Sequence, residues 1–270
     1  MQFLPRLAHP GGAIKVTSTT ARSEEGRSAA FEPALTIDGD PASDLILLCD
    51  HARNTIPEPY GDLGLSSAEL GRHIAYDIGA EALTRRLAER LGATAVIAGF
   101  SRLLIDPNRG VDDPTLILRV SDRISIPGNT DVDAAERRIR LERFYEPYHA
   151  AIDAIVAKRL ALGRPPAILS VHSFTPFWEG VQRPWHAGIL WDSDPQSAAK
   201  LIERLRTDPT IIVGDNEPYS GKAPTNGTLN RHATRHGLKH ALIEVRQDLI
   251  ADPAGVEAWA DRLVPMLQDL

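Results

Sequence analysis

Two histidines directly follow apolar segments of the chain, where predicted strands would end. LILLC runs into His51 after one aspartate, and AILSV runs directly into His172. Glu244 lies near the end of a third apolar segment. Neutral imidazole is a natural zinc ligand, and a carboxylate outside the ligand set can take a proton from the attacking water. The pattern predicts a hydrolytic metal site with His51 and His172 as ligands and Glu244 as the base.

Each of these residues alone also has a structural interpretation. A histidine at a strand end can simply be a hydrogen-bonded turn residue. Glu244 could form a salt bridge with Arg246, two residues further along the same predicted strand. In open parallel sheets, ligand sites form beyond the carboxyl ends of the strands. The shared position at strand ends therefore favours one joint site.

A second group of residues is suited to binding an anion. FSRLLIDPNRG places Asn108 and Arg109 after an apolar run. A planar guanidinium can hold a carboxylate through two hydrogen bonds, and an amide adds a donor. Simple turn chemistry at Pro107 is the alternative. Arg102 and Arg53 are further candidates for contact with a substrate carboxylate.

Three other features are candidates for contact with the site. His73 and Asp77 are four residues apart in a predicted helix and would share one face, either at the site or as a surface pair. Tyr219, in the turn-rich loop DNEPYSG, could cover a bound substrate. His232 and His236 have the same spacing, and we interpret them as surface residues of a helix, with contact to the substrate as the alternative.

The sequence alternates between predicted strands and predicted helices. Apolar segments of strand length lie at 45–49, 93–100, 167–174, 186–192 and 238–246. Helical patterns cover 66–92, 131–163 with a kink or division at Pro147, 197–206, and the segment after Pro253. Ser66 and Glu69 have the spacing of a capping box. Strands that are apolar on both faces and alternate with helices predict an α/β fold with a mostly parallel mixed sheet between two helical layers.

We expect a single α/β domain over residues 36–270. Residues 1–35 are rich in Gly, Ser, Thr and charged residues and lack sustained apolar periodicity, which predicts a loosely ordered extension. The oligomeric state is left open.

Composition excludes several classes of protein. The net charge of −6 argues against binding to a nucleic-acid backbone. The single cysteine, Cys49, excludes an internal disulfide framework and a cysteine-rich zinc module. We see no membrane span and no secretory signal, so the expected compartment is the cytoplasm.

The motifs DHARN, DPNR, SVHSF and IEVR occur in an order that resembles the N-formylglutamate amidohydrolase family, over about residues 44 to 250. The stretches HIAYDIGA, HAGILWD, VGDNEPYSG and EVRQDL strengthen the resemblance. More distantly, the chain resembles the zinc carboxypeptidases and the succinylglutamate and aspartoacyl deacylases. The resemblance implies a zinc-carboxypeptidase-like fold and the hydrolysis of N-formyl-L-glutamate to formate and L-glutamate, a reaction of histidine catabolism that uses a divalent metal, zinc.

The resemblance also implies roles for individual residues. His51 and His172 match the histidine ligands, and Glu244 matches the general base. Asn108 and Arg109 match the pair that holds the substrate carboxylate. Further substrate contacts are expected from these residues: Arg102, Arg53, Tyr219 and Arg246.

One position departs from the pattern of these relatives. Their first metal motif is His-x-x-Glu, whereas the fourth residue here is Asn54. An amide oxygen is a weaker zinc ligand than a carboxylate. We expect that Asp50 or Asp77 completes the ligand set, that metal binding is weak, or that the ion is not zinc. Two alternatives therefore stay open: a deacylase or small peptidase for another N-acyl amino acid, and a metal-free binding or regulatory protein on the same scaffold.

Overall fold

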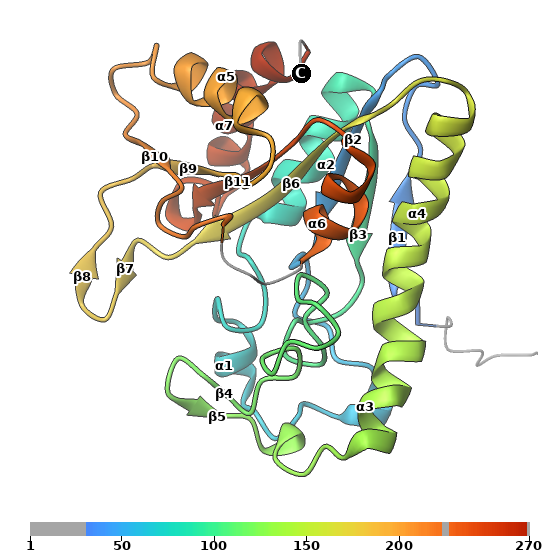
Figure 1. Cartoon of the computed structure of the whole chain (residues 1–270). Helices are drawn as coiled ribbons and strands as arrows, with labels where there is room; N and C mark the ends of the chain where they lie inside the picture. The colour runs from blue at the N-terminus through green and yellow to red at the C-terminus, as the bar shows by residue number, and fades with distance from the viewer. Residues whose placement is uncertain (1–30, 223–226, 269–270) are drawn as a thin grey trace, which may run out of the picture. The chain divides into compact units, whose positions relative to one another are not determined.

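The computed structural model describes residues 31–222 and 227–268, and its centre is a seven-stranded sheet (Figure 1). In spatial order the strands are β1 (Ala34–Ile37), β3 (Thr94–Ala98), β2 (Leu45–Cys49), β6 (Ala167–Phe174), β11 (His240–Arg246), β9 (Ala187–Leu190) and β10 (Val213–Asp215). The strand β2 is parallel to β3 and to β6, β6 is parallel to β11, and β9 is parallel to β10. The strands β1 and β9 run antiparallel to β3 and β11. The predicted mostly parallel mixed sheet is confirmed.

Helices cover both faces of this sheet. The helices of the described residues are α1 (Ser67–Leu70), α2 (Ala80–Leu91), α3 (Ala134–Arg140), α4 (Glu146–Ala161), α5 (Pro195–Leu205), α6 (Thr228–His232) and α7 (Pro253–Leu267). The helices α2, α5 and α7 pack on one face, and α4, the long yellow-green helix in Figure 1, packs on the other. Two short hairpins lie outside the sheet: β4 (Val120–Ser121) with β5 (Ile124–Ser125), and β7 (Phe177–Trp178) with β8 (Val181–Gln182). Among the helices of the described residues, none has the length and apolar character needed to cross a membrane.

Alternate residues of the central strands supply two separate apolar cores. Leu45 and Leu47 of β2 belong to the core beneath α2, α5 and α7, whereas Ile46 and Leu48 belong to the core beneath α4. Successive side chains of a strand point to opposite faces, so a strand covered on both faces must be apolar throughout. The run LILLC is thus explained by the three-layer architecture.

The single helix predicted over 66–92 is wrong. The capping box is present, with Ser66 Oγ accepting a hydrogen bond from the Glu69 amide at 3.2 Å, but α1 ends at Leu70 and α2 begins only at Ala80. Gly79 has a φ of 82°, and a Cβ there would lie 2.2 Å from the carbonyl oxygen of Ile250. This backbone conformation favours glycine and interrupts the helix. His73 and Asp77 consequently lie in a non-helical connection and do not share a helix face.

Two other predicted elements differ in detail. The helical segment predicted over 131–163 is divided into α3 and α4 by a π-helical turn, Leu141–Tyr145, just before Pro147. Pro147 lies in the first turn of α4, where its missing N–H costs little. The strand β9 runs antiparallel to β11, so Asp192, which follows β9, lies toward the amino end of β11.

Most of the extension predicted for residues 1–35 lies outside the described residues. Within the described part, Ala34 and Leu35 already belong to β1, and they pair with Ala98 and Ile97 of β3. The sheet therefore includes the last residues of that segment.

Candidate active site

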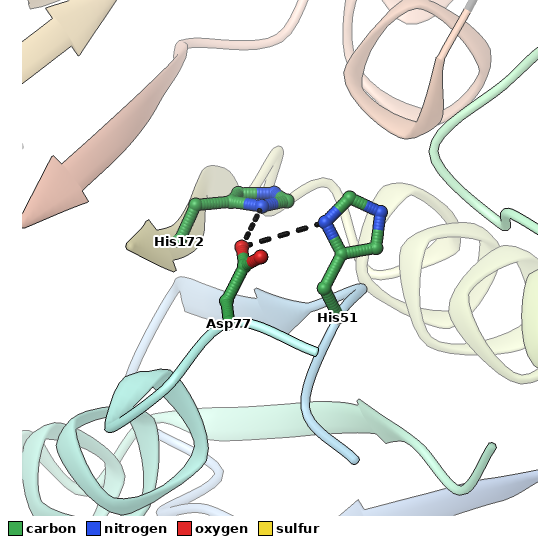
Figure 2. A group of neighbouring side chains, drawn as sticks. All are labelled: His51, Asp77 and His172. Atoms are coloured by element: carbon green, nitrogen blue, oxygen red, sulfur yellow. Dashed lines mark hydrogen bonds and ion pairs between the residues drawn. The ribbon is translucent and has the colours of Figure 1, made fainter. Parts of the chain in front are cut away.

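Three buried side chains converge from separate parts of the chain (Figure 2). His51 follows β2, His172 lies on the adjacent strand β6, and Asp77 comes from the connection between α1 and α2. Asp77 Oδ2 is 2.8 Å from Nδ1 of His172 and 3.4 Å from Nδ1 of His51. One potential ligand atom from each residue lies within 4.8 Å of the others. These three residues are called the His-Asp-His group below.

A second carboxylate lies behind each imidazole. His51 Nε2 is 2.7 Å from Asp106 Oδ1, and His172 Nε2 is 3.1 Å from Asp50 Oδ2. Since a carboxylate only accepts, Nε2–H is the donor in both rings, and both Nδ1 atoms point toward Asp77. In His172 the contact of Nδ1 with Asp77 is also a hydrogen bond to a carboxylate, so both nitrogens of that ring donate when no cation is bound. Such carboxylate–imidazole pairs orient histidine ligands around metals and raise their basicity.

Asp50 is held firmly in its position behind His172. Its Oδ1 accepts hydrogen bonds from Thr228 Oγ1 at 2.7 Å and from the Tyr148 hydroxyl at 2.8 Å. Its Oδ2 accepts one from Ser170 Oγ at 2.9 Å. The structure therefore places Asp50 behind a member of the His-Asp-His group and not within it.

The electrostatics of the group favour a positive charge. Burial opposes ionisation of Asp77, but the charges and hydrogen bonds of His51 and His172 outweigh it and lower the Asp77 pKa. Burial likewise opposes protonation of His172, yet hydrogen bonds to Asp50 and Asp77 raise its pKa well above the ordinary value. A pocket that attracts protons in this way also attracts other cations.

The donor set fits a divalent cation. Two imidazole nitrogens and one carboxylate oxygen are a common set for a catalytic zinc site that keeps a position open. Nδ1 of His51 is buried, and among the described residues it has no hydrogen-bond partner. Because Nε2 of His51 carries the proton, the lone pair of Nδ1 points toward the Asp77 carboxylate. Both groups are acceptors, so a cation between them would stabilise this arrangement.

Glu244 lies beside the group, on β11. It is paired in register with His172 on β6 and is buried. Burial raises the pKa of Glu244 to about 7, with the negative charge of Asp77 adding to the rise against the opposing charge of His172. Within the described part of the chain, its Oε2 atom has no hydrogen-bond partner. A carboxylate with a pKa near neutrality is suited to general acid–base chemistry.

The His-Asp-His group and Glu244 line a cavity of about 690 Å³. Arg102, Asn108, Arg109 and Tyr219 also line it. Arg102 is tied to Asp106 at 2.8 Å, whereas both ion pairs of Arg109, to Asp106 and Asp113, are 3.9 Å long. The Arg109 guanidinium is therefore the more loosely held of the two and the better placed to bind an incoming carboxylate.

Three of the residues predicted for the site lie elsewhere. The Asn54 amide donates to the carbonyl oxygen of Leu70 at 2.9 Å, and Asn54 is absent from both the His-Asp-His group and the cavity lining. Arg53 makes two hydrogen bonds to Glu81, at 2.8 and 2.9 Å. Arg246, at the carboxyl end of β11, binds Asp248 at 2.8 Å and does not line the cavity. Each of these side chains is occupied by a local partner outside the cavity.

Sequence reasoning missed the role of Asp106. The DPNR segment was interpreted as an anion-binding turn, but its aspartate accepts hydrogen bonds from His51, from Arg102 and from the Asn108 amide at 2.9 Å. Asp106 thus links the His-Asp-His group to the arginine side of the cavity. The sequence indicates that Asp106 belongs to the same turn as Asn108 and Arg109. Its contact with His51, which is 55 residues away in the sequence, cannot be predicted from local patterns.

Known proteins provide an independent comparison. The family model of N-formylglutamate amidohydrolase matches residues 43–251. The crystal structure of gene product Atu2144 from Agrobacterium tumefaciens is 37% identical, with a TM-score of 0.85 over 88% of this chain and 94% of that chain. The N-formylglutamate amidohydrolase from Ralstonia eutropha JMP134 is 21% identical, with a TM-score of 0.67 over 88% and 96% of the two chains, and shows the same fold. No curated protein matches the sequence. With its buried His-Asp-His group and its neighbouring carboxylate, this chain belongs to the N-formylglutamate amidohydrolase family and is an amidohydrolase.

Proposed function

We propose that the protein hydrolyses the amide bond of an N-acyl amino acid in a reaction that depends on a divalent cation, zinc, with N-formyl-L-glutamate as the reference substrate. One observation carries the proposal: His51, Asp77 and His172 converge in the wall of a cavity that Glu244 also lines. Membership of the N-formylglutamate amidohydrolase family supports the formyl substrate.

The His-Asp-His group would hold the cation through the two Nδ1 atoms and Oδ2 of Asp77. A bound divalent cation supplies Lewis-acid chemistry, because it polarises a carbonyl oxygen and lowers the pKa of water. Asp106 and Asp50 keep the two imidazoles in the tautomer and orientation that this role requires.

Glu244 would move the proton. As a carboxylate it accepts a proton from the attacking water, and as the resulting acid it donates that proton to the departing nitrogen. Glu244 lines the same cavity as the His-Asp-His group, and its buried Oε2 has no hydrogen-bond partner among the described residues. A pKa near neutrality suits both halves of this exchange.

Arg109, assisted by Asn108 and Arg102, would bind the carboxylates of the amino-acid part. The residues follow β3, on the far side of β2 from His172, and line the cavity next to His51. Cationic side chains placed there hold the amino-acid half of the substrate to one side of the cleaved bond.

Replacing Arg109 by alanine should impair hydrolysis of N-formyl-L-glutamate by about 10- to 100-fold in kcat/KM. Hydrogen bonds to charged groups contribute about 1.5–3 kcal/mol, and each 1.36 kcal/mol corresponds to a tenfold change in rate. Steady-state assays should compare N-formyl-L-glutamate with an analogue whose carboxylates are amidated. Arg85→Ala, on the exposed side of α2, is the matched control. An equal loss on both substrates would refute the carboxylate-binding role of Arg109.

Removal of the cation should destabilise the fold. A ligand present at 100 times its Kd stabilises the native state by about 2.7 kcal/mol, which corresponds to a rise in Tm of about 5–10 °C for a domain of this size. Thermal unfolding should therefore shift downward after chelation and recover when zinc is added. The same experiment on His172→Ala should show no response to zinc. A zinc response of equal size in that variant would place the cation elsewhere.

The activity itself can be tested by following release of formate and L-glutamate from N-formyl-L-glutamate. We expect turnover by zinc-loaded protein and none by the His51→Ala or His172→Ala variants, with the fold retained by circular dichroism. Near-normal turnover in either variant would contradict the proposed site.

A further inference from the structure

The cavity is larger than N-formyl-L-glutamate requires. That molecule has 12 non-hydrogen atoms, and even at the ~30 Å³ that one water molecule occupies in the liquid, they would fill about 360 Å³. The cavity encloses about 690 Å³. Roughly half of the space is therefore left for another part of a substrate.

The strand order shows where that space lies. The arginines follow β3, the histidines of the His-Asp-His group lie at β2 and β6, and the cavity continues over β11 and β9. The His-Asp-His group thus lies between the arginine side and this continuation. If the amino-acid carboxylates bind the arginines, the acyl group must point toward β11 and β9.

This second part of the cavity has both apolar and polar side chains in its wall, and the polar ones include Asp192, Lys222 and Thr234. Leu242 of β11, Leu190 of β9, Trp191 directly after β9, and Leu229 of α6 line it. We name these four residues the acyl arm. From Glu244, the lining residues of β11 continue through Leu242 to His240, a distance of about 13 Å at 3.3 Å per residue. A formyl group ends in a single hydrogen and would leave the acyl arm empty.

The walls of the acyl arm are held in place by specific contacts. Trp191 Nε1 donates to Asp215 Oδ1 at 2.6 Å, and Nζ of Lys222 lies 4.2 Å from the centre of the Trp191 ring. At the far end, Nε2 of His240 lies 3.3 Å from the hydroxyls of both Ser193 and Thr234. The arm is therefore a built pocket with a polar end wall.

Leu242 is the most informative residue of the acyl arm. It is only partly buried, although it lies in the middle of a strand that has a neighbour on each side, and the residues flanking it, Ala241 and Ile243, are buried. Leaving a leucine side chain exposed in a concave pocket forgoes the free energy of its burial. An apolar ligand group would recover that energy.

We propose that the acyl arm binds an acyl group of several carbon atoms, so that the preferred substrates are N-acyl amino acids with a longer, largely apolar acyl chain. The inference rests on the proposed amidohydrolase function and specifies its substrate class. The amide C–N bond breaks, the hydroxyl of water joins the acyl carbon, and its proton joins the nitrogen. The products are a free carboxylic acid and an amino acid.

The test is a series of substrates that differ only in the acyl group: formyl, acetyl, butanoyl and hexanoyl-L-glutamate, each assayed with zinc-loaded enzyme. We expect kcat/KM to rise along the series by up to about fourfold for each methylene group buried in the arm. A steady fall from the formyl compound onward would overturn the inference and leave the proposed function standing. If all four compounds, the formyl one included, resist hydrolysis, the proposed function and the inference both fail.

Filling the arm should reverse this preference. Leu242→Phe and Leu229→Trp each add volume to its wall, and each should lower the hexanoyl-to-formyl ratio of kcat/KM by at least about tenfold. Leu229 lies on the short surface helix α6, so it keeps the test available if the β11 variant does not fold. Leu162→Trp, at an exposed position 62% accessible beyond α4, is the matched control. An unchanged ratio in a folded arm variant would overturn the inference.

Discussion

Asp77→Asn should lower the zinc content of the purified protein and reduce its kcat/KM for N-formyl-L-glutamate by more than about 100-fold. Partners that only orient metal ligands already cost 10- to 100-fold in metal affinity when they are mutated. Asp77 contributes an oxygen directly to the His-Asp-His group and balances the charge of two imidazoles. Removing this oxygen ligand should therefore lower the metal affinity by more than about 10- to 100-fold. Elemental analysis and steady-state kinetics on the same preparation measure the two effects together.

Asn54→Ala is the informative comparison for Asp77→Asn. Asn54 occupies the sequence position of the metal-binding glutamate in the His-x-x-Glu motif, but its amide binds the carbonyl oxygen of Leu70 outside the cavity. Surface substitutions usually change free energies by less than about 0.5 kcal/mol, or roughly twofold. Zinc content and kcat/KM should accordingly stay within about twofold of the parent protein. Loss of zinc from the Asn54 variant, with retention in the Asp77 variant, would reverse the assignment.

Glu244→Gln should reduce kcat by about 10²- to 10⁴-fold, the usual contribution of a general acid–base residue. The variant keeps the shape and burial of the side chain but cannot accept the proton of water, so zinc content and KM should change little. Glu203→Gln, at an exposed position of α5, is the matched control. A variant with near-normal kcat would exclude Glu244 as the base.

The pH profile provides a second readout for Glu244. The base must be ionised, so kcat/KM should fall as the pH drops through the pKa of Glu244. Burial raises that pKa to about 7 in the protein without a cation, and a bound cation would lower it. The acidic limb of the zinc-loaded enzyme should therefore have its midpoint below 7 and should be absent from Glu244→Gln. The same limb in the variant would assign it to another group.

The sequence predicted the architecture because the central strands are covered on both faces. β2 and β6 are buried along their whole length, so their composition differs clearly from that of helices and turns. The rule that parallel strands present their carboxyl ends at one edge was sufficient to bring His51, His172 and Glu244 together. Local patterns do not record strand direction, which explains why the antiparallel orientation of β9 went unrecognised.

The position of Asp77 was beyond reach of local patterns. Residues 66–92 have apolar residues at helical spacing, which predicts one helix. The helix is interrupted at Gly79, where the backbone packs against Ile250, a residue far away in the sequence. The same limit applies to Asp106, whose contact with His51 spans 55 residues. Both carboxylates were visible as residues in quoted motifs, but only the folded chain shows which imidazole each one faces.

Titration of cation-free protein with zinc, while hydrolysis of N-formyl-L-glutamate is followed, tests the central claim most directly. We predict that activity is absent without zinc, rises in proportion to bound zinc and saturates at one ion per chain, and that the His172→Ala variant neither binds the ion nor gains activity. Full turnover by protein shown to contain no divalent cation would contradict the account.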